Sequence, residues 1–357
     1  MKAELTATDQ AHLRRALELA EGGRGRVSPN PLVGAVIVRD DEVIGEGFHA
    51  ELGGLHAERA ALADCRERGE DPAGATMYVT LEPCAHQGRQ PPCVEAILEA
   101  GIGRVVIASE DPSEKAAGRG PGILRDGGVE VAFASGAEAT AARRLNQPFR
   151  KHSRTGLPLV VLKMAMSLDG QTATAPGDSP WISGPESREL VHQWRAESDA
   201  IAVGIGTALA DDPLLTARIE GARQPIRVVF DSRARLPLDS QLLQTLDQAP
   251  VLVVIAPGAP ADRVGALESA GAEVLVAADL ESALRELGRR GVTSFFLEGG
   301  RTLAAAFVAA GQVDESRTFV APMLLGRQPN PARLTALSAE PRNVGEDTLI
   351  TAAYREW

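Results

Sequence analysis

Three side chains in the first hundred residues have the types and spacing of a metal site. His56 is followed by Cys84, which stands beside Pro83, and then by Cys93. One imidazole and two thiolates can fill three corners of a tetrahedral zinc site, and the fourth corner then stays open for water, as in catalytic sites. Cys93 opens an expected helix, and a helix N-terminus favours the anionic thiol that a metal ligand must be. The spacing therefore predicts one catalytic zinc ion held by His56, Cys84 and Cys93.

Glu58 lies two residues beyond the expected histidine ligand and has the chemistry of a proton shuttle. Its carboxylate could move a proton from the water to a departing amine. The alternative is that these residues only pack, because a lone histidine or cysteine is more often a core residue than a ligand. Two of the three cysteines fall in this one motif, so we favour the metal site; Cys65 we expect to pack within a helix. His-x-Glu followed by Pro-Cys and Cys is typical of zinc nucleobase deaminases.

Length and charge narrow the class of protein. A chain of 357 residues is too long for one ordinary core and suggests two domains. The net charge of −11 argues against nucleic acid as the main partner. No apolar run approaches the length of a membrane span, and the N-terminus lacks a signal-peptide pattern. Three cysteines with two expected ligands leave no disulfide framework, so we expect a cytoplasmic protein.

Helices and strands alternate in the first half and would bring these residues to one edge of a sheet. An amphipathic helix is expected over 8–21, then a loop with two prolines that contains Asn30. Asn30 and His49 would lie near the start of the His56 helix, where a substrate could be read, although Asn30 fits a simple turn equally well. Strands are expected at 33–38, up to His49, and at 75–81, 104–109 and 129–133. The first half is thus predicted to be a three-layer α/β/α domain.

A second α/β domain is predicted beyond the polar, basic run 150–156, which has the composition of a surface linker. We therefore expect domains at 1–149 and 157–357. Strands are expected at 158–163, 200–203, 226–230, 251–255, 272–276 and 294–297, helices at about 185–196 and 302–310, and a final strand pair near 317–320. No Gly-x-Gly-x-x-Gly follows a strand, so no Rossmann fingerprint is predicted. Glycine turns at 204–207 and 299–300 could meet a phosphate, although plain tight turns are the simpler interpretation.

The motifs of the first half resemble the deaminase half of the bifunctional riboflavin-biosynthesis deaminase/reductase family. They are Pro29-Asn-Pro31 with Val33-Gly34, His56-Ala-Glu58, Glu82-Pro-Cys-Ala-His86, Gly88-Arg-Gln-Pro-Pro-Cys93, Glu110-Asp-Pro112 and Gly118-Arg-Gly120. The resemblance implies that the pyrimidine and its ribose phosphate are held by Asn30, His49, His86 and Arg89. Arg89 suits a phosphate by its charge and fork geometry, although it could be an ordinary solvated loop arginine.

The second half resembles the reductase half of the same family, through Ser167-Leu-Asp-Gly170, Ala210-Asp-Asp-Pro213 and Ala321-Pro-Met-Leu-Leu-Gly326. The resemblance implies a dihydrofolate-reductase-like fold and NADPH as the cofactor. It implies cofactor contacts at Ala165, Trp181, Thr207, Asp211, Ser232, Gly300, Arg301 and Thr302. It also implies reductase substrate contacts at Ser179, Arg195, Leu215, Arg218 and Glu298. Trp181 taken alone would be interpreted as a core aromatic residue.

One charged turn after the strand 226–230 bears on the choice of cofactor. Asp231 favours NAD, which needs an acidic partner for its 2′-hydroxyl, whereas Ser232, Arg233 and Arg235 favour the 2′-phosphate of NADP. The hydroxyl and the two guanidinium groups are three donors for a phosphate, whereas the single carboxylate could simply cap the turn. We therefore expect NADPH as the cofactor. A solvated charged turn is the alternative.

With both halves matched, the resemblance implies a two-step enzyme of riboflavin biosynthesis. Zinc-dependent hydrolytic deamination of 2,5-diamino-6-ribosylamino-4(3H)-pyrimidinone 5′-phosphate would precede reduction of the ribosyl to the ribityl side chain by NADPH. The reduction also needs a proton donor, for which Asp211, Lys163 and water are the candidates. The alternatives are a protein that keeps zinc structurally and a zinc nucleobase or nucleoside deaminase with a non-catalytic second domain. We expect a small-molecule substrate, no nucleic-acid or membrane partner, and a homo-oligomer.

Overall fold

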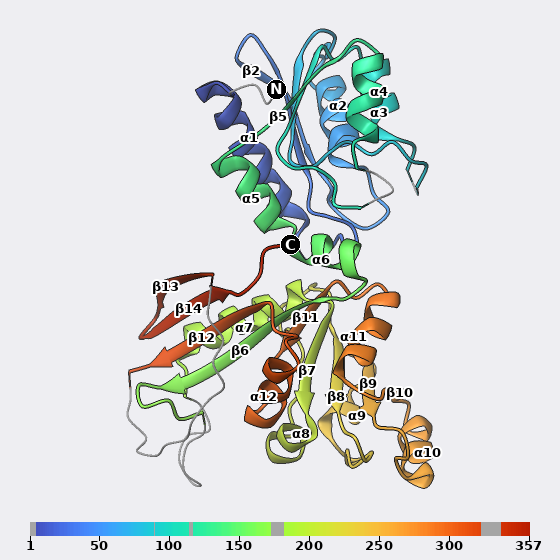
Figure 1. Ribbon diagram of the computed structural model, residues 1–357, viewed down its shortest axis with the longest axis vertical. Helices are drawn as coiled ribbons and strands as arrows, with labels where there is room; N and C mark the ends of the chain where they lie inside the picture. The colour runs from blue at the N-terminus through green and yellow to red at the C-terminus, as the bar shows by residue number, and fades with distance from the viewer. Residues whose placement is uncertain (1–4, 89, 114–116, 173–181, 323–336) are drawn as a thin grey trace. The chain divides into compact units, whose positions relative to one another are not determined.

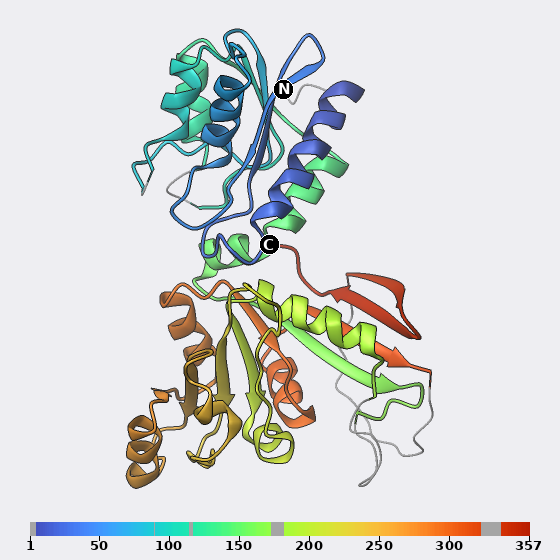
Figure 2. The same cartoon turned by 180° about the vertical axis from the view of Figure 1, so that it is seen from behind.

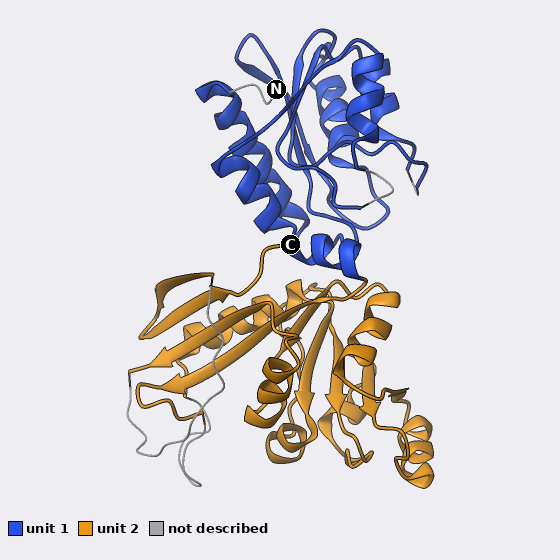
Figure 3. Cartoon of the chain, in the orientation of Figure 1, with its two compact units in different colours: residues 1–155, 357 blue, residues 156–356 orange. Residues whose placement is uncertain are grey.

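The computed structural model describes residues 5–88, 90–113, 117–172, 182–322 and 337–357. The chain divides into two compact units, Met1–Thr155 with Trp357 and Gly156–Glu356 (Figure 3). Each unit is built on one sheet with helices on both of its faces (Figures 1 and 2). The predicted α/β class is therefore confirmed for both halves of the chain.

The first unit contains a five-stranded sheet in the order β2-β1-β3-β4-β5. Its strands are β1 (Gly34–Arg39), β2 (Glu42–Phe48), β3 (Thr76–Val79), β4 (Arg104–Ile107) and β5 (Glu130–Phe133). β1 is antiparallel to β2 and β3, whereas β3, β4 and β5 run parallel. The carboxyl ends of the parallel strands therefore meet at one edge, as the sequence predicted.

Helices cover both faces of this sheet. On one face lie α1 (Ala7–Ala20) and α5 (Ala137–Leu145), and on the other α2 (Ala57–Glu67), α3 (Cys93–Glu99) and α4 (Arg119–Asp126); a short 3-10 turn, η1 (Glu21–Gly23), follows α1. Leu13 of α1 packs with one side of the sheet, whereas Leu62 of α2 and Ile97 of α3 pack with the other. Cys65 is fully buried in this second core, which confirms the packing role expected for it.

The basic run expected to be a surface linker is largely helical instead. It falls mostly within α6 (Gln147–Thr155), where Arg150 is 1% exposed. Arg150 Nε donates to the Trp357 carbonyl (2.6 Å), and Nη1 donates to the Ser109 hydroxyl (3.1 Å). The linker prediction was wrong because this helix is held in place by a buried guanidinium and its polar partners. The run therefore lacks the apolar periodicity by which a helix is recognised in a sequence.

The second unit contains a nine-stranded sheet in the order β10-β9-β8-β7-β11-β6-β12-β14-β13. Its strands are β6 (Leu159–Ser167), β7 (Ala200–Gly204), β8 (Ile226–Phe230), β9 (Val251–Ile255), β10 (Glu273–Val276), β11 (Ser294–Leu297), β12 (Glu315–Ala321), β13 (Ser338–Val344) and β14 (Asp347–Ala353). β14 is antiparallel to β12 and β13, and the other pairs are parallel. The β13–β14 hairpin was not predicted, because β13 is polar, mostly exposed and contains Pro341.

The helices of the second unit pack on both sides of its sheet. They are α7 (Pro185–Glu197), α8 (Ile205–Asp211), α9 (Gln241–Gln244), α10 (Ala261–Ser269), α11 (Leu280–Arg289) and α12 (Arg301–Ala309). α11 and α12 bury Leu284 and Phe307 against Phe295, whereas Trp194 of α7 lies 5.9 Å from the ring of Phe296. Since neighbours along β11 point to opposite faces, these contacts define the two layers. Within the described residues, every helix is too short or too polar to cross a bilayer.

A buried ionic cluster joins α1 to the first sheet. Asp9 is 3% exposed and accepts hydrogen bonds from Tyr78 Oη (2.9 Å), Arg104 Nη1 (2.7 Å) and the Thr6 backbone N–H (2.9 Å). Burial alone would raise the pKa of Asp9, but the hydrogen bonds from Arg104, Thr6 and Tyr78 outweigh it and hold the pKa well below its ordinary value. The folded protein therefore stabilises the carboxylate form of Asp9 over the protonated form.

We expect Asp9→Asn to destabilise the protein near pH 7 by roughly 1–3 kcal/mol, because buried donors lose a charged acceptor. A carboxylate with a depressed folded pKa contributes stability above its unfolded pKa of about 3.9 and loses this contribution as the pH falls toward the folded pKa. The difference between wild type and variant in urea unfolding should therefore shrink from about pH 6 to about pH 3. Asp40→Asn, at an exposed aspartate, is the matched control. A difference that does not change with pH would contradict this role.

Candidate active sites

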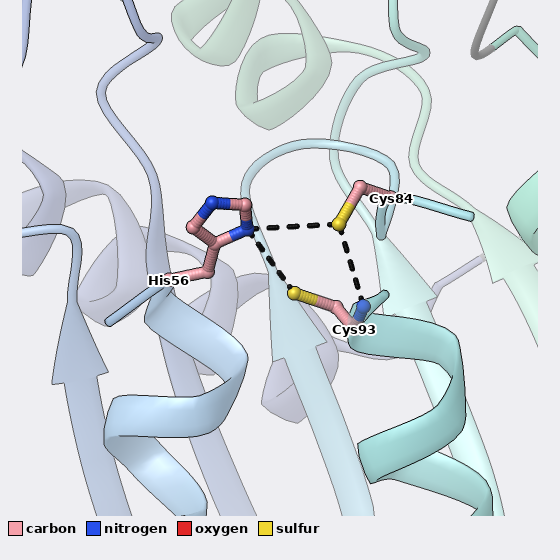
Figure 4. A group of neighbouring side chains, drawn as sticks. All are labelled: His56, Cys84 and Cys93. Carbon is pink, nitrogen blue, oxygen red and sulfur yellow. Dashed lines mark hydrogen bonds between the residues drawn. The ribbon is translucent and has the colours of Figure 1, made fainter. Parts of the chain in front are cut away.

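Three ligand atoms converge where the first sheet ends (Figure 4). His56 directly precedes α2, Cys84 follows β3 and Cys93 opens α3. His56 Nδ1 lies 3.6 Å from Cys84 Sγ and 3.3 Å from Cys93 Sγ, and all three atoms lie within 4.8 Å of one another. A tetrahedral ion with Zn–N bonds of about 2.1 Å and Zn–S bonds of about 2.3 Å sets nitrogen and sulfur about 3.6 Å apart. The donor set and its spacing therefore fit zinc.

The contact between the two thiols shifts their pKa values in opposite directions. The hydrogen bond from Cys93 is the largest cause that lowers the pKa of Cys84, to about 4, and His56 contributes to the same shift. The pKa of Cys93 is raised, because its S–H donates to Cys84 and because it is buried. The Cys93 backbone N–H also donates to Cys84 Sγ (3.3 Å). One thiolate is thus prepared in the protein, and a divalent cation would displace the remaining thiol proton.

Glu58 lies in the first turn of α2, beside the ligand atoms, and is 4% exposed. Burial is the main cause that raises the pKa of Glu58, to about 7, and the nearby Cys84 adds to the shift. A carboxyl group with a pKa near neutrality can both take and return a proton at physiological pH. Glu58 therefore has the position and the proton affinity of a general base and acid.

A cavity of about 760 Å³ is lined by His56, Glu58 and Cys84, and Asn30, His49 and His86 are also among its lining. His49 Nδ1 lies 2.9 Å from the Leu55 carbonyl, so this nitrogen carries the proton and donates. His49 Nε2 lies 3.1 Å from Asn30 Nδ2 and therefore accepts from the amide. Burial lowers the pKa of His49, which keeps the ring neutral in this arrangement. Arg89 lies outside the described residues.

The cavity is also lined by residues to which the sequence interpretation gave no role. They are Glu82, Asp111, Ser113, Arg119, Phe149 and Ser153. Glu82 stands inside a quoted motif, and its carboxylate accepts from the Asp111 backbone N–H (3.4 Å), which ties the segment after β4 to the metal-ligand segment. Phe149 and Ser153 belong to α6, and Ser153 lies in the run that was expected to be a linker.

In the second unit, a buried ion pair follows β11. Glu298 Oε1 and Oε2 accept from Arg195 Nε (2.7 Å) and Nη2 (3.0 Å), and Lys163 Nζ lies 4.0 Å away. Burial alone would raise the pKa of Glu298, but Arg195 and then Lys163 lower it below its ordinary value. Glu298 is therefore held as a carboxylate. The bidentate geometry also fixes the Arg195 guanidinium in one orientation.

The loop after α8 is attached to this ion pair. Arg195 Nη1 donates to the Thr216 carbonyl (3.1 Å), next to Leu215. Leu215 and Arg218 have φ angles of 55° and 51°, in the left-handed region that side chains rarely adopt. The structure thus brings the Arg195–Glu298 pair and the 215–218 loop together.

The expected cofactor residues occupy the ends of strands and helices. Thr207 Oγ1 accepts from the Gly300 backbone N–H (3.2 Å), which joins the start of α8 to the start of α12. Arg301 and Thr302 are the first residues of α12, Asp211 ends α8, Ser232 follows β8 and Ala165 lies in β6. Ser179 and Trp181 lie outside the described residues.

Two family models match the chain, one in each unit. The cytidine and deoxycytidylate deaminase zinc-binding region matches residues 6–109, and the RibD C-terminal domain matches residues 158–345. The riboflavin biosynthesis protein RibD of Actinobacillus pleuropneumoniae is 42% identical over 327 residues, which cover 90% of this chain and 85% of the relative. The RibD of Escherichia coli (strain K12) is 40% identical over 345 residues, 89% of each protein.

Solved structures agree over nearly the whole chain. RibD of Acinetobacter baumannii (form 1) has a TM-score of 0.85 and 39% identity, and covers 98% of this chain and 99% of its own. A diaminohydroxyphosphoribosylaminopyrimidine deaminase/5-amino-6-(5-phosphoribosylamino)uracil reductase from Thermotoga maritima has a TM-score of 0.83, 35% identity and the same coverage. The matches include both units and explain why zinc-ligand residues in one accompany a separate ion-paired site in the other. The chain therefore belongs to the RibD family of riboflavin biosynthesis proteins and is a bifunctional enzyme with a deaminase and a reductase.

Proposed function

We propose that the first unit deaminates 2,5-diamino-6-ribosylamino-4(3H)-pyrimidinone 5′-phosphate and that the second reduces the ribosyl side chain to ribityl with NADPH. The observation that carries the first step is the convergence of His56, Cys84 and Cys93 at a cavity of about 760 Å³, which the buried Glu58 also lines. The Arg195–Glu298 pair and the adjoining 215–218 loop support a second site. Both steps agree with the two activities for which the Thermotoga maritima protein is named.

In the deamination, zinc bound by the three ligand residues supplies the Lewis acidity that lowers the pKa of water. Glu58 takes one proton from water, and the hydroxide adds to the ring carbon that bears the amine. The carbon–nitrogen bond then breaks, and Glu58 returns the proton to the leaving ammonia. His49 fixes the Asn30 amide by accepting from Nδ2, so that Asn30 Oδ1 is oriented to accept from an N–H group of the pyrimidine.

We expect Glu58→Gln to reduce deamination by about 100-fold or more, because the amide cannot carry the proton. Zinc content should stay near one ion per chain, since Glu58 is a base and no ligand. The measurements are ammonia release and metal analysis of the purified protein. Cys84→Ser is the matched comparison, and it should lose zinc together with activity. Near-normal turnover by Glu58→Gln would remove Glu58 from the mechanism.

In the reduction, NADPH held by the second unit would supply the hydride for C1′ of the ring-opened ribosylamine, whose C1′–nitrogen double bond also needs a proton on the nitrogen. Lys163, Asp211 and water remain the candidate proton donors. Glu298 and Thr216 already engage the Arg195 guanidinium. Arg218 is exposed and is therefore the better candidate to hold the substrate phosphate.

The turn after β8 supports NADPH rather than NADH. Asp231 is fully buried, and its Oδ2 accepts from the backbone N–H groups of Arg235 and Leu236. A carboxylate used in this way caps its own turn and cannot reach a ribose hydroxyl. Ser232, Arg233 and Arg235 are exposed on the same turn. We infer that these three side chains receive the 2′-phosphate.

Changing Ser232, Arg233 and Arg235 together to alanine should reduce the preference for NADPH over NADH by about tenfold or more, because the donors to the 2′-phosphate are lost. The measurement is kcat/KM of the reductase with each cofactor. The value for NADH should stay near that of the wild type, which controls for damage to the fold. An unchanged ratio would show that another segment selects the cofactor.

We further infer that the two activities are separable, because each unit has its own sheet, core and site residues. A protein of residues 156–357 should reduce the deaminated intermediate with NADPH at a rate within about threefold of the full chain. Absorbance at 340 nm measures NADPH consumption, and circular dichroism confirms folding. A folded fragment that needs the first unit for activity would contradict the separation.

The compartment and assembly remain part of this proposal. Three free cysteines and a net charge of −11 are compatible with a cytoplasmic enzyme of a small phosphorylated substrate. We propose that the chain forms a homo-oligomer and uses neither nucleic acid nor a membrane as a partner. Size-exclusion chromatography with light scattering measures the oligomeric state directly.

A further inference from the structure

Arg227 is a buried cation in an interior strand of the second sheet. It lies in β8, between β7 and β9, and is 0% exposed. Nη1 donates to the Leu214 carbonyl (3.2 Å) and to Thr245 Oγ1 (2.8 Å), whereas Nη2 donates to the carbonyls of Thr245 (2.8 Å) and Ala249. All four acceptors are neutral. Burial of a guanidinium against neutral acceptors is costly, so its position calls for a role beyond filling the core.

The contact with Leu214 places Arg227 beside a strained turn. Leu215, the next residue, has a φ of 55° and is 2% exposed. A left-handed backbone is unfavourable for a residue with a β-carbon, and such residues persist only where their surroundings hold them. Strain of this kind clusters at functional sites.

Two arginines hold the carbonyls on either side of Leu215. Arg227 binds the carbonyl of Leu214, and Arg195 binds the carbonyl of Thr216 (3.1 Å). Arg195 is in turn fixed by its bidentate pair with Glu298. The turn is therefore clamped from β8 on one side and from the ion pair on the other.

A third contact closes the same turn. Gln224 Oε1 accepts from the Ala217 backbone N–H (2.8 Å), just before Arg218, whose φ is also positive at 51°. Ala217 is fully buried, whereas Arg218 is exposed. The backbone from Leu214 to Arg218 is thus held at three points, with Leu215 and Ala217 buried and the Arg218 cation exposed.

We propose that Arg227 is a positioning residue of the reductase: by holding the Leu214 carbonyl it fixes the strained Leu215 turn and so sets the place of Leu215 and Arg218 for the phosphorylated substrate. The inference rests on the proposed function, in which the exposed Arg218 holds the phosphate of the ribosylamine substrate. Arg227 itself touches no reacting atom. Its effect is on substrate binding and not on hydride transfer.

The test is Arg227→Lys in the full chain. Lysine keeps the charge, but its single ammonium group cannot donate both to the Leu214 carbonyl and to the carbonyls of Thr245 and Ala249, as the two arms of the guanidinium do. We expect KM for the deaminated intermediate to rise by about tenfold, while kcat, KM for NADPH and the deaminase rate change by less than about twofold. Thr245→Val is the matched control, because it removes one acceptor of Arg227 and leaves the Leu214 contact. Its KM for the intermediate should remain near that of the wild type.

A variant that unfolds at lower temperature yet keeps the wild-type KM for the intermediate would overturn the proposal, because Arg227 would then act only on stability. If Arg227→Lys does not fold, Gln224→Ala loosens the same turn from its other end, where the side chain is half-buried. It should show the same selective rise in KM, and an unchanged KM would again overturn the proposal.

Arg218→Ala separates this proposal from the function on which it rests. A rise in KM with Arg218→Ala and none with Arg227→Lys contradicts the positioning role alone. No rise with either variant, or no reduction of the intermediate by the wild type, contradicts the proposed substrate site itself.

Discussion

Gly45 and Gly47 allow α2 to lie directly on β2, and the metal-ligand geometry of the first unit depends on this close packing. A β-carbon at Gly47 would stand 2.3 Å from the Ala61 backbone nitrogen, and one at Gly45 would stand 2.4 Å from Cys65 Sγ. No side chain fits at either distance. Because His56 and Glu58 are at the start of α2, a helix pushed away from β2 would carry both residues away from the cysteines on the next segments.

A second close approach fixes the other side of the same site. A β-carbon at Gly120, in the first turn of α4, would lie 2.1 Å from the Pro83 carbonyl oxygen. Pro83 precedes Cys84, so α4 rests on the segment that bears this ligand. Glu82 adds a hydrogen bond to the segment after β4. The ligands therefore converge because backbones, and not only side chains, are packed against one another at the end of the sheet.

The sequence was sufficient to predict that His56, Cys84 and Cys93 lie together, because they sit at the ends of strands and helices whose boundaries follow from local patterns. It was insufficient wherever a polar side chain is buried. The basic residues around Arg150 led to the prediction of a linker where α6 lies. Arg227 interrupts a strand whose other residues are apolar, and the neighbouring sequence gives no sign of its distant hydrogen-bond partners. The cavity wall formed by Arg119 and Ser153 also depends on tertiary packing, which local spacing does not encode.

Glu58 and Glu298 show how the two units give the same chemical group opposite properties. Both carboxyl groups are buried, and burial alone would raise the pKa of each. Around Glu58 the charge of Cys84 adds to burial, and together they raise the pKa to about 7. Around Glu298 the cations of Arg195 and Lys163 overcome burial and keep the carboxylate charged. The first environment suits a group that must exchange a proton in every turnover, whereas the second suits a fixed charge that orients its neighbours. The sign of the neighbouring charge, and not the degree of burial, thus sets the direction in which the pKa of each of these two carboxyl groups is shifted.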